Sequence, residues 1–272
     1  MSRIFRGLVI PLLSAVVFGL VADTGTAAVT LPHAQDWDTI SPWTQVYNGS
    51  SLDGSQSVPS SSSPSLRFNY TKGMYNGTAP DKVWVSWTPT QSEVWTQYYF
   101  KYSSNFYFHT TDNKQAYWYI SESKSNWYVS CSSGQKMRMV FQRNSGDNKS
   151  GTRFSNTSYN PTIERDTWYN LTVRAVMNTG ETANGIFQMW INDQLVMNHS
   201  DIAYLVGTDV GRKVVSMSFD PVFGGMAGLY KPADDYFWVG RTIISTDPLE
   251  LVPPSLISGV MNPLPPSRLS IK

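Results

Sequence analysis

Short runs of alternating apolar and polar residues recur along this sequence, and helical periodicity is almost absent. The runs are rich in Val, Ile, Thr and aromatic residues, and Gly, Asn, Asp, Ser or Pro separate them. Alternation with period two is typical of a half-buried strand. Many strands with no intervening helices indicate antiparallel sheets. The sequence therefore predicts an all-β fold, either a sandwich or a barrel.

The predicted strands cover most of the chain between residues 65 and 245. They are Ser65–Tyr70, Lys82–Trp87, Glu93–Tyr102, Gln115–Ser121, Lys136–Arg143, Thr167–Met177, Gly185–Asn192, Lys213–Asp220 and Asp235–Ser245. The length fits one large β-domain as well as two small ones. We expect one sandwich over residues 29–247. The proline-rich stretch 248–272 cannot pair in the centre of a sheet, so it is predicted to be a tail or linker.

Alternation separates two faces on each predicted strand. The apolar faces are expected in the core; they carry Met137, Met139, Trp118, Leu171, Val173, Phe187 and Met189. The opposite faces mix aromatic rings with Arg, Lys or Gln. In a curved sandwich one sheet shows such a face as a groove, where rings and polar groups suit a sugar polymer. On the convex sheet the same pattern is an ordinary solvated surface.

The first residues have the pattern of an export signal. Arg3 and Arg6 precede an uncharged, mostly apolar run over 7–22, and small residues follow at 24–28. This pattern predicts a signal peptide over residues 1–28 and a secreted protein, extracellular or periplasmic. The run is shorter than the roughly 20 residues of a spanning helix. An uncleaved membrane anchor is the alternative; after cleavage we expect no membrane association.

Composition narrows the partners. The net charge is +1 and no basic stripe is present, which argues against nucleic acid. The single cysteine, Cys131, excludes an intramolecular disulfide and is expected to fill space in the core. No cofactor is predicted, although Asp147 and Asp234–Asp235 leave a structural Ca²⁺ open; such residues mostly serve turn geometry. We expect a monomer that binds an extracellular polysaccharide.

Several segments resemble one family. Residues 178–196 read NTGETANG and then IFQMWINDQLV, residues 98–114 read YYFKYSSNFYFHTTDNK, and residues 221–225 read PVFGG. In this order they resemble concanavalin A-like polysaccharide lyases of the alginate and glucuronan type and their uncharacterised relatives, over roughly residues 80 to 247. The resemblance implies a jelly-roll sandwich of two antiparallel sheets. Asn184-Gly185 suits a tight turn before the strand that begins in this segment, because both residues tolerate positive φ.

The resemblance also implies candidate residues for β-elimination. Lys114 falls at the position of a family lysine, Arg138 lies on a strand where relatives place an arginine, and His109 precedes both. Tyr117 and Tyr119 share a face, and one of them would act as a base if a cation such as Arg138 lowered its pKa from about 10. The predicted substrate-binding residues are Arg174, Gln188 and Trp190; Arg138 or Gln188 would hold the uronate carboxylate.

The sequence departs from the characterised alginate lyases. It lacks their paired tyrosines on a Gly-flanked strand and their Gln-Ile-His signature. The favoured interpretation is therefore a secreted polysaccharide-binding or polysaccharide-active protein. A lyase acting on a uronate-containing glycan and a non-catalytic structural or adhesive surface protein are the alternatives, so the enzyme class stays open. A hydrolase is disfavoured because no paired carboxylates share a strand face.

Overall fold

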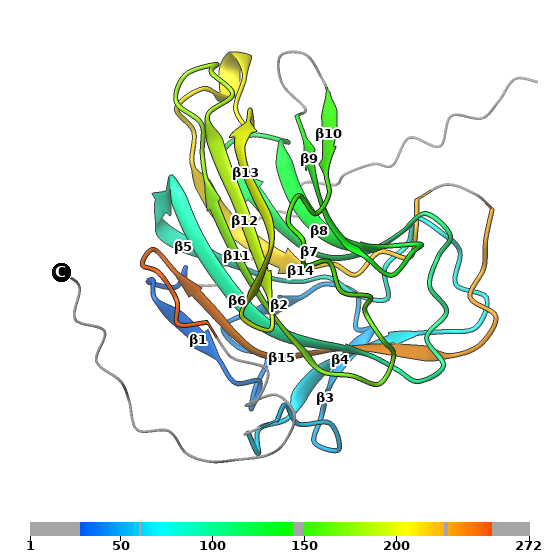
Figure 1. The fold of residues 1–272 in the computed structure, drawn as a ribbon. Coiled ribbons are helices and arrows are strands. Elements are labelled where there is room, and N and C mark those ends of the chain that lie inside the picture. The colour runs from blue at the N-terminus through cyan, green and yellow to red at the C-terminus, as the bar shows by residue number, and fades with distance from the viewer. Residues whose placement is uncertain (1–27, 60, 144–148, 226–227, 252–272) are drawn as a thin grey trace, which may run out of the picture.

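Two antiparallel sheets pack face to face in the computed structural model, which describes residues 28–59, 61–143, 149–225 and 228–251 (Figure 1). Sheet I contains, in spatial order, β13 (Gln194–Ile202), β12 (Gly185–Ile191), β11 (Tyr169–Val176), β6 (Glu93–Tyr102), β15 (Asp235–Ser245), β4 (Ser65–Tyr70) and β3 (Ser50–Asp53); β1 (His33–Gln35) also pairs with β15. Sheet II contains β10 (Ser150–Arg153), β9 (Met137–Gln142), β8 (Asn126–Ser132), β7 (Asp112–Ile120), β14 (Val214–Phe219), β5 (Val83–Gln91) and β2 (Thr44–Gln45).

This architecture confirms the predicted all-β jelly-roll sandwich, with two sheets that do not close into a barrel. Among the described residues the one helical element is a 3₁₀ turn, η1 (Gly207–Asp209). No helix in the described part of the chain is long and apolar enough to cross a bilayer. Of the predicted signal peptide only residue 28 is described, and of the predicted tail only residues 248–251, so both predictions fall outside the described residues.

The predicted strands are present, and three have the predicted bounds: β4, β6 and β15. Two longer strands were not predicted from the sequence, β8 and β13. β8 follows a stretch of Ser and Lys that has the composition of a loop, and β13 carries Asn, His, Ser and Asp at its end. Both strands pair with a neighbour along their length. Tertiary pairing has overridden weak local propensity there.

The core lies between the two sheets and is dominated by aromatic rings. All seven predicted core residues are at most 1% exposed, which confirms the assignment of faces. Trp118 from β7 stacks on Trp127 from β8 with ring centroids 4.0 Å apart and planes 6° apart. Cys131 is completely buried, as expected for a core filler. Much of the high aromatic content therefore serves packing, since each such ring buries a large apolar area.

A buried ion pair holds the loop that leads into β7. Lys231 Nζ donates to both carboxylate oxygens of Asp235 at 2.9 and 2.8 Å and to the Tyr107 carbonyl at 3.0 Å. Asp235 Oδ2 also accepts the Tyr107 backbone N–H at 2.8 Å. Burial lowers the pKa of Lys231 to about 8 and raises that of Asp235. Because a broken buried pair leaves an uncompensated charge, this contact fixes the path of residues 103–111.

A β-bulge interrupts the alternation in β7. The pairing of β7 with β8 shifts between Lys114 and Ala116, so Gln115 is the extra residue. The Gln115 side chain is fully buried, where Oε1 accepts from Tyr98 Oη and Nε2 donates to Tyr102 Oη, both at 2.9 Å. The bulge therefore places Gln115 and Ala116 toward the core and leaves Lys114 and Tyr117 on the outer face.

Candidate functional site on the outer face of sheet II

A row of polar side chains crosses the outer face of sheet II at right angles to its strands. Lys114 of β7 pairs with Ser130 of β8, and Ser130 pairs with Arg138 of β9. On the other side of β7, Phe219 of β14 pairs with both Ala116 and Val83, which places the next residue, Asp220, between Lys114 and Lys82. We call Lys82, Asp220, Lys114, Ser130 and Arg138 the charged row. At about 4.8 Å between strands, it is about 19 Å long.

A second row lies directly beside the charged row. It consists of Trp84, Ser218, Tyr117, Tyr128 and Val140, which are neighbours in the register of β5, β14, β7, β8 and β9. We call it the aromatic row. Tyr117, Tyr128 and Val140 form a cluster separate from the core, yet they are only 6–8% exposed. This face is thus a sheltered surface and differs from the freely solvated face that simple alternation would produce.

Lys114 lies where the two rows meet. Its ammonium nitrogen lies 5.1 Å from the centroid of the Tyr128 ring and 6.0 Å from that of Tyr117. Burial lowers the pKa of Lys114, and Arg138 lowers it further, while Asp112 and Asp220 oppose the shift. Among the described residues, none forms a hydrogen bond or ion pair with its side chain. A sheltered amine with a lowered pKa is suited to accept a proton.

Arg138 marks the end of the charged row, where its guanidinium is fixed. Its Nη2 lies 2.9 Å from Asp112 Oδ2 and donates to the Thr111 carbonyl at 3.3 Å, and its Nε donates to Ser130 Oγ at 3.3 Å. The arginine side chain stays partly exposed. These contacts orient a cation toward the outer face, although Asp112 neutralises part of its charge.

The pKa values of Tyr117 and Tyr119 are shifted in the direction opposite to the one expected from the sequence. Burial raises the pKa of Tyr117 and of Tyr119 well above the usual value, and the carboxylate of Asp220 adds to both shifts. Burial thus opposes the hypothesis that a neighbouring cation lowers a tyrosine pKa to make it a base. Tyr119 lies one row further along β7, with its hydroxyl 3.0 Å from Ser218 Oγ and Lys82 Nζ 4.6 Å from its ring centroid. A raised pKa favours the role of proton donor for both tyrosines.

His109 does not lie on the outer face. Its side chain is fully buried, and its ring meets Phe223 edge-on at 4.8 Å between centroids. Nδ1 accepts the Thr111 backbone N–H at 3.1 Å. At Gly224, with φ +63°, a Cβ atom would lie 2.3 Å from the imidazole Cδ2, so glycine leaves the room for this ring. The structure places His109 as a buried support of the turn into β7.

The three predicted substrate-binding residues lie on the opposite side of the sandwich. Arg174, Gln188 and Trp190 belong to β11 and β12, on the outer face of sheet I. Arg174 pairs with Glu93 at 2.8 Å and donates to Gln188 Oε1 at 3.0 Å, and Trp190 stacks on Trp95. Packed sheets are about 10 Å apart. A groove shared by these residues with Lys114 or Tyr117 is therefore excluded.

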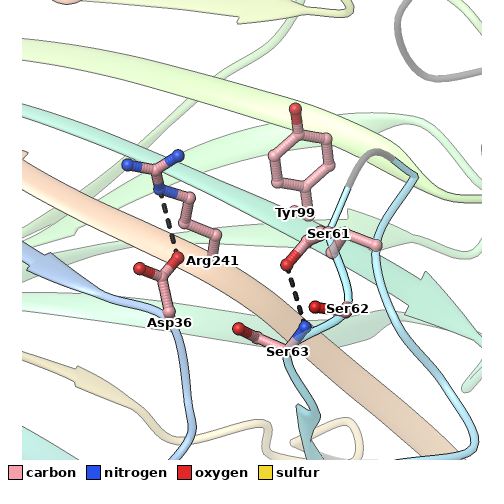
Figure 2. A pocket seen from close by; sticks show the side chains of 7 residues that line it. Asp36, Ser61, Ser62, Ser63, Tyr99 and Arg241 are labelled. Carbon is pink, nitrogen blue, oxygen red and sulfur yellow. Dashed lines mark hydrogen bonds and ion pairs between the residues drawn. The ribbon is translucent and has the colours of Figure 1, made fainter. Parts of the chain in front are cut away.

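A cavity of about 330 Å³ also lies on the side of sheet I (Figure 2). It is lined by Asp36, Val58, Ser61, Ser62, Ser63, Tyr99 and Arg241. Figure 2 shows the Arg241 guanidinium beside Asp36, with Nε 3.3 Å from Oδ1, and the serines on the facing loop. It contains none of the residues of the charged row or the aromatic row.

The described residues offer no metal centre: no three His, Cys, Asp or Glu side chains among them lie close enough to hold an ion. Asp234 accepts the Lys72 backbone N–H at 2.6 Å, and Asp235 is held by Lys231. These contacts account for two of the aspartates considered for Ca²⁺. Asp147 lies outside the described residues.

The two rows contain seven residues that were missed in the sequence: Lys82, Asp220, Ser130, Trp84, Ser218, Tyr128 and Val140. Lys82 and Asp220 are the terminal residues of two predicted strands, and their polar character was the available signal. Their proximity follows only from the position of β14 between β5 and β7. Tyr128 belongs to β8, a strand that the sequence did not predict.

Solved structures share this fold at low sequence identity. An endo-β-1,4-glucuronan lyase from the fungus Trichoderma reesei superposes with a TM-score of 0.57 at 13% identity, over 79% of this chain and 95% of that one. A PL-14 alginate lyase from Aplysia kurodai gives 0.56 at 14%, over 76% and 92%. An alginate lyase from a Chlorella virus gives 0.53 at 11%, over 73% and 93%. At these identities the likeness shows the fold.

Among curated proteins, none matches the sequence significantly. A family model does match: the model of polysaccharide lyase 14 covers residues 102–239, about half of the chain, from the end of β6 into β15. The match includes Lys114, Arg138 and Asp220, and it agrees with the resemblance seen in the sequence. The protein is thus a polysaccharide-active protein of the jelly-roll type, and the chain belongs to the polysaccharide lyase 14 family.

Proposed function

We propose that this protein is a secreted lyase that cleaves a uronate-containing polysaccharide by β-elimination on the outer face of sheet II. The observation that carries the proposal is the charged row beside the aromatic row, with Lys114 at their junction. Secretion is part of the proposal and rests on the signal-peptide pattern of residues 1–28.

The two rows offer complementary contacts to an acidic polymer. Lys82, Lys114 and Arg138 stand on every second strand of the row, about 10 Å apart at the usual strand spacing. Cations along this line attract uronate carboxylates. Tyr117 and Tyr128 are only 6–8% exposed, so they would border a bound sugar without offering it an open ring face. A polymer lying across the strands would contact both rows along its length.

The side chains can also perform the elimination. Arg138 or Lys82 would bind the uronate carboxylate and stabilise the negative charge that develops when C5 loses its proton. Lys114 Nζ would accept that proton, and the electrons of the C5–H bond would form the C4–C5 double bond. The C4–O bond breaks with its electron pair on the glycosidic oxygen, which takes a proton from Tyr117 or Tyr128. Because Lys114 must be neutral to act, we expect an alkaline pH optimum.

Binding without turnover is the second candidate function. It is favoured by one contact, the ion pair of Arg138 with Asp112, which already neutralises the cation that would serve the carboxylate. In that case the rows would retain a polymer and leave it intact. The family and the fold fit both candidates, since fold alone does not determine chemistry.

A panel of polymers tests the proposal. The purified mature protein would be incubated with glucuronan, alginate and pectate, and with a neutral β-glucan as control, from neutral to alkaline pH. We expect ultraviolet absorbance from unsaturated uronates with at least one acidic polymer and none with the neutral glucan. Gel retardation by an acidic polymer without new absorbance would establish the binding function. Neither signal with any acidic polymer would reject both candidates.

A further inference from the structure

Asp220 lies between Lys82 and Lys114 in the charged row, and backbone hydrogen bonds join its segment to that of Lys114. It follows the last residue of β14, and its N–H donates to the Gln115 carbonyl at 3.1 Å. The Lys114 N–H donates to the Val222 carbonyl at 3.1 Å, and the Val222 N–H donates to the Asp220 carbonyl at 2.8 Å. These bonds fix the main chain of both residues and place the Asp220 and Lys114 side chains near each other on the outer face.

The carboxylate of Asp220 faces charges from every strand beside it. Lys114 lies on β7, and Lys82 precedes β5; both interact with Asp220 electrostatically, as does the more distant Asp81. The phenols of Tyr117 and Tyr119 lie on the same face and stay neutral. Among the described residues, none donates a hydrogen bond to the Asp220 side chain. Its interaction with the lysines is therefore electrostatic.

Asp81, which precedes Lys82 in the sequence, is a second carboxylate near this end of the charged row and differs from Asp220 in its contacts. It is fully buried and accepts hydrogen bonds from the backbone N–H groups of Tyr47 at 2.7 Å and Ser50 at 3.0 Å. Asp81 is thus a structural carboxylate that organises its own loop. Asp220 has no such role, and it is half-buried beside the amine that the reaction uses. Burial raises the pKa of Asp220 to about 6, against the effect of both lysines, so the group is ionised at alkaline pH.

We propose that Asp220 is a positioning residue of the lyase reaction, whose carboxylate stabilises the ammonium that forms when Lys114 accepts the C5 proton. The inference rests on the proposed function. The proton leaves C5 and binds Lys114 Nζ, and the bonding electrons become the C4–C5 double bond. The positive charge then on Lys114 lies beside the negative charge of Asp220, which lowers the energy of the transition state in which it develops.

Asp220→Asn tests this role because it removes the charge and keeps the shape. Without the carboxylate the pKa of Lys114 falls, because Asp220 is one of the charges that hold it up. We therefore expect the acid limb of the pH–rate profile to move to lower pH and the plateau rate to drop about 10-fold or more. Asp220→Glu, which restores the charge, should move the limb back. Asp38→Asn at an exposed aspartate is the matched control and should leave the profile unchanged.

A second measurement follows Lys114 without turnover. NMR titration of ¹³C-labelled lysines, with Lys114 assigned by its loss in Lys114→Met, reports the pKa of the amine in the wild type and in Asp220→Asn. A lower pKa in Asp220→Asn supports the inference, and an unchanged pKa overturns it. If the wild type is active and Asp220→Asn keeps its acid limb, the inference alone fails. If the wild type forms no unsaturated product from any polymer, the proposed function fails and the inference falls with it.

Discussion

The two outer faces of the sandwich carry the same kinds of side chain in different states. On sheet I, Arg174 contacts Glu93 and Gln188 and lies over the Trp95 ring, 5.4 Å from its centroid. Lys101 on the same face pairs with Asp166 at 3.1 Å and with Gln56. On sheet II, the Lys114 ammonium nitrogen lies 5.1 and 6.0 Å from two tyrosine ring centroids and has no ion pair among the described residues.

The difference shows what separates a structural cation from a candidate functional one. A cation whose donors are all used holds neighbouring strands together and has little left to offer a ligand. A sheltered cation that forms no hydrogen bond or ion pair, and that interacts with carboxylates only at longer range, keeps its donors for a ligand, and burial lowers its pKa. Composition and alternation are alike on the two faces, so the distinction lies in the partners that the fold supplies.

Removal of the Lys114 amine gives the largest expected effect. Lys114→Ala should lower turnover of an acidic polymer by about 10²- to 10⁴-fold, the usual contribution of a proton-transferring group. Initial rates of unsaturated-uronate formation measure the loss. The melting temperature should change little, since the side chain makes no hydrogen bond in the described structure. Full activity in Lys114→Ala would contradict the placement of the active site on the outer face of sheet II.

Two matched arginines compare the faces directly. Arg138 and Arg174 each pair with one carboxylate, at 2.9 and 2.8 Å. Arg138→Ala should lower kcat about 10- to 100-fold and change substrate binding less, because the carboxylate contact strengthens in the transition state. Arg174→Ala should leave kcat unchanged. Arg174→Ala loses a partly exposed ion pair, worth about 0–1 kcal/mol. Arg138→Ala leaves the buried Asp112 carboxylate without its cation, so its stability should fall more, and kcat is compared at a temperature where both variants are folded. Equal kinetic effects would contradict the assignment of function to one face.

The smallest effect is expected at Trp190. Its ring is half-buried and stacks on Trp95 with centroids 5.6 Å apart, a contact worth about 1 kcal/mol. Trp190→Ala should lower the melting temperature slightly and leave turnover and glycan retention on affinity gels near wild type. Unchanged turnover with lost retention would identify the face of sheet I as a second polysaccharide-binding surface.

Local pattern predicted the core but could not assign faces to sheets. Trp118 and Leu171 alternate with polar neighbours in the same way, so their burial was readable from the sequence. Tyr117 and Trp190 also occupy equivalent outward positions, yet β7 joins sheet II and β12 joins sheet I. That choice depends on long-range strand order, which local periodicity does not contain.

The ionisation of the site was also beyond the sequence. Lys82, Asp220 and Lys114 are neighbours only because β14 lies between β5 and β7. The pKa values of Tyr117 and Tyr119 rise because neighbours from other strands bury both rings, and the Asp220 carboxylate raises them further. Lys114 and Arg138 were identified through a family resemblance, and the structure brings them onto one row of sheet II.

The bulge at Gln115 has a mechanical consequence for this face. Its amide joins Tyr98 and Tyr102 of β6, so a residue of sheet II is anchored to sheet I immediately beneath Lys114. Sliding of one sheet over the other would break buried hydrogen bonds at that point, which is costly when no water replaces them. The hydrogen bonds of Gln115 to sheet I therefore hold the backbone that carries the Lys114 amine. A change that breaks these bonds between the sheets would displace the amine.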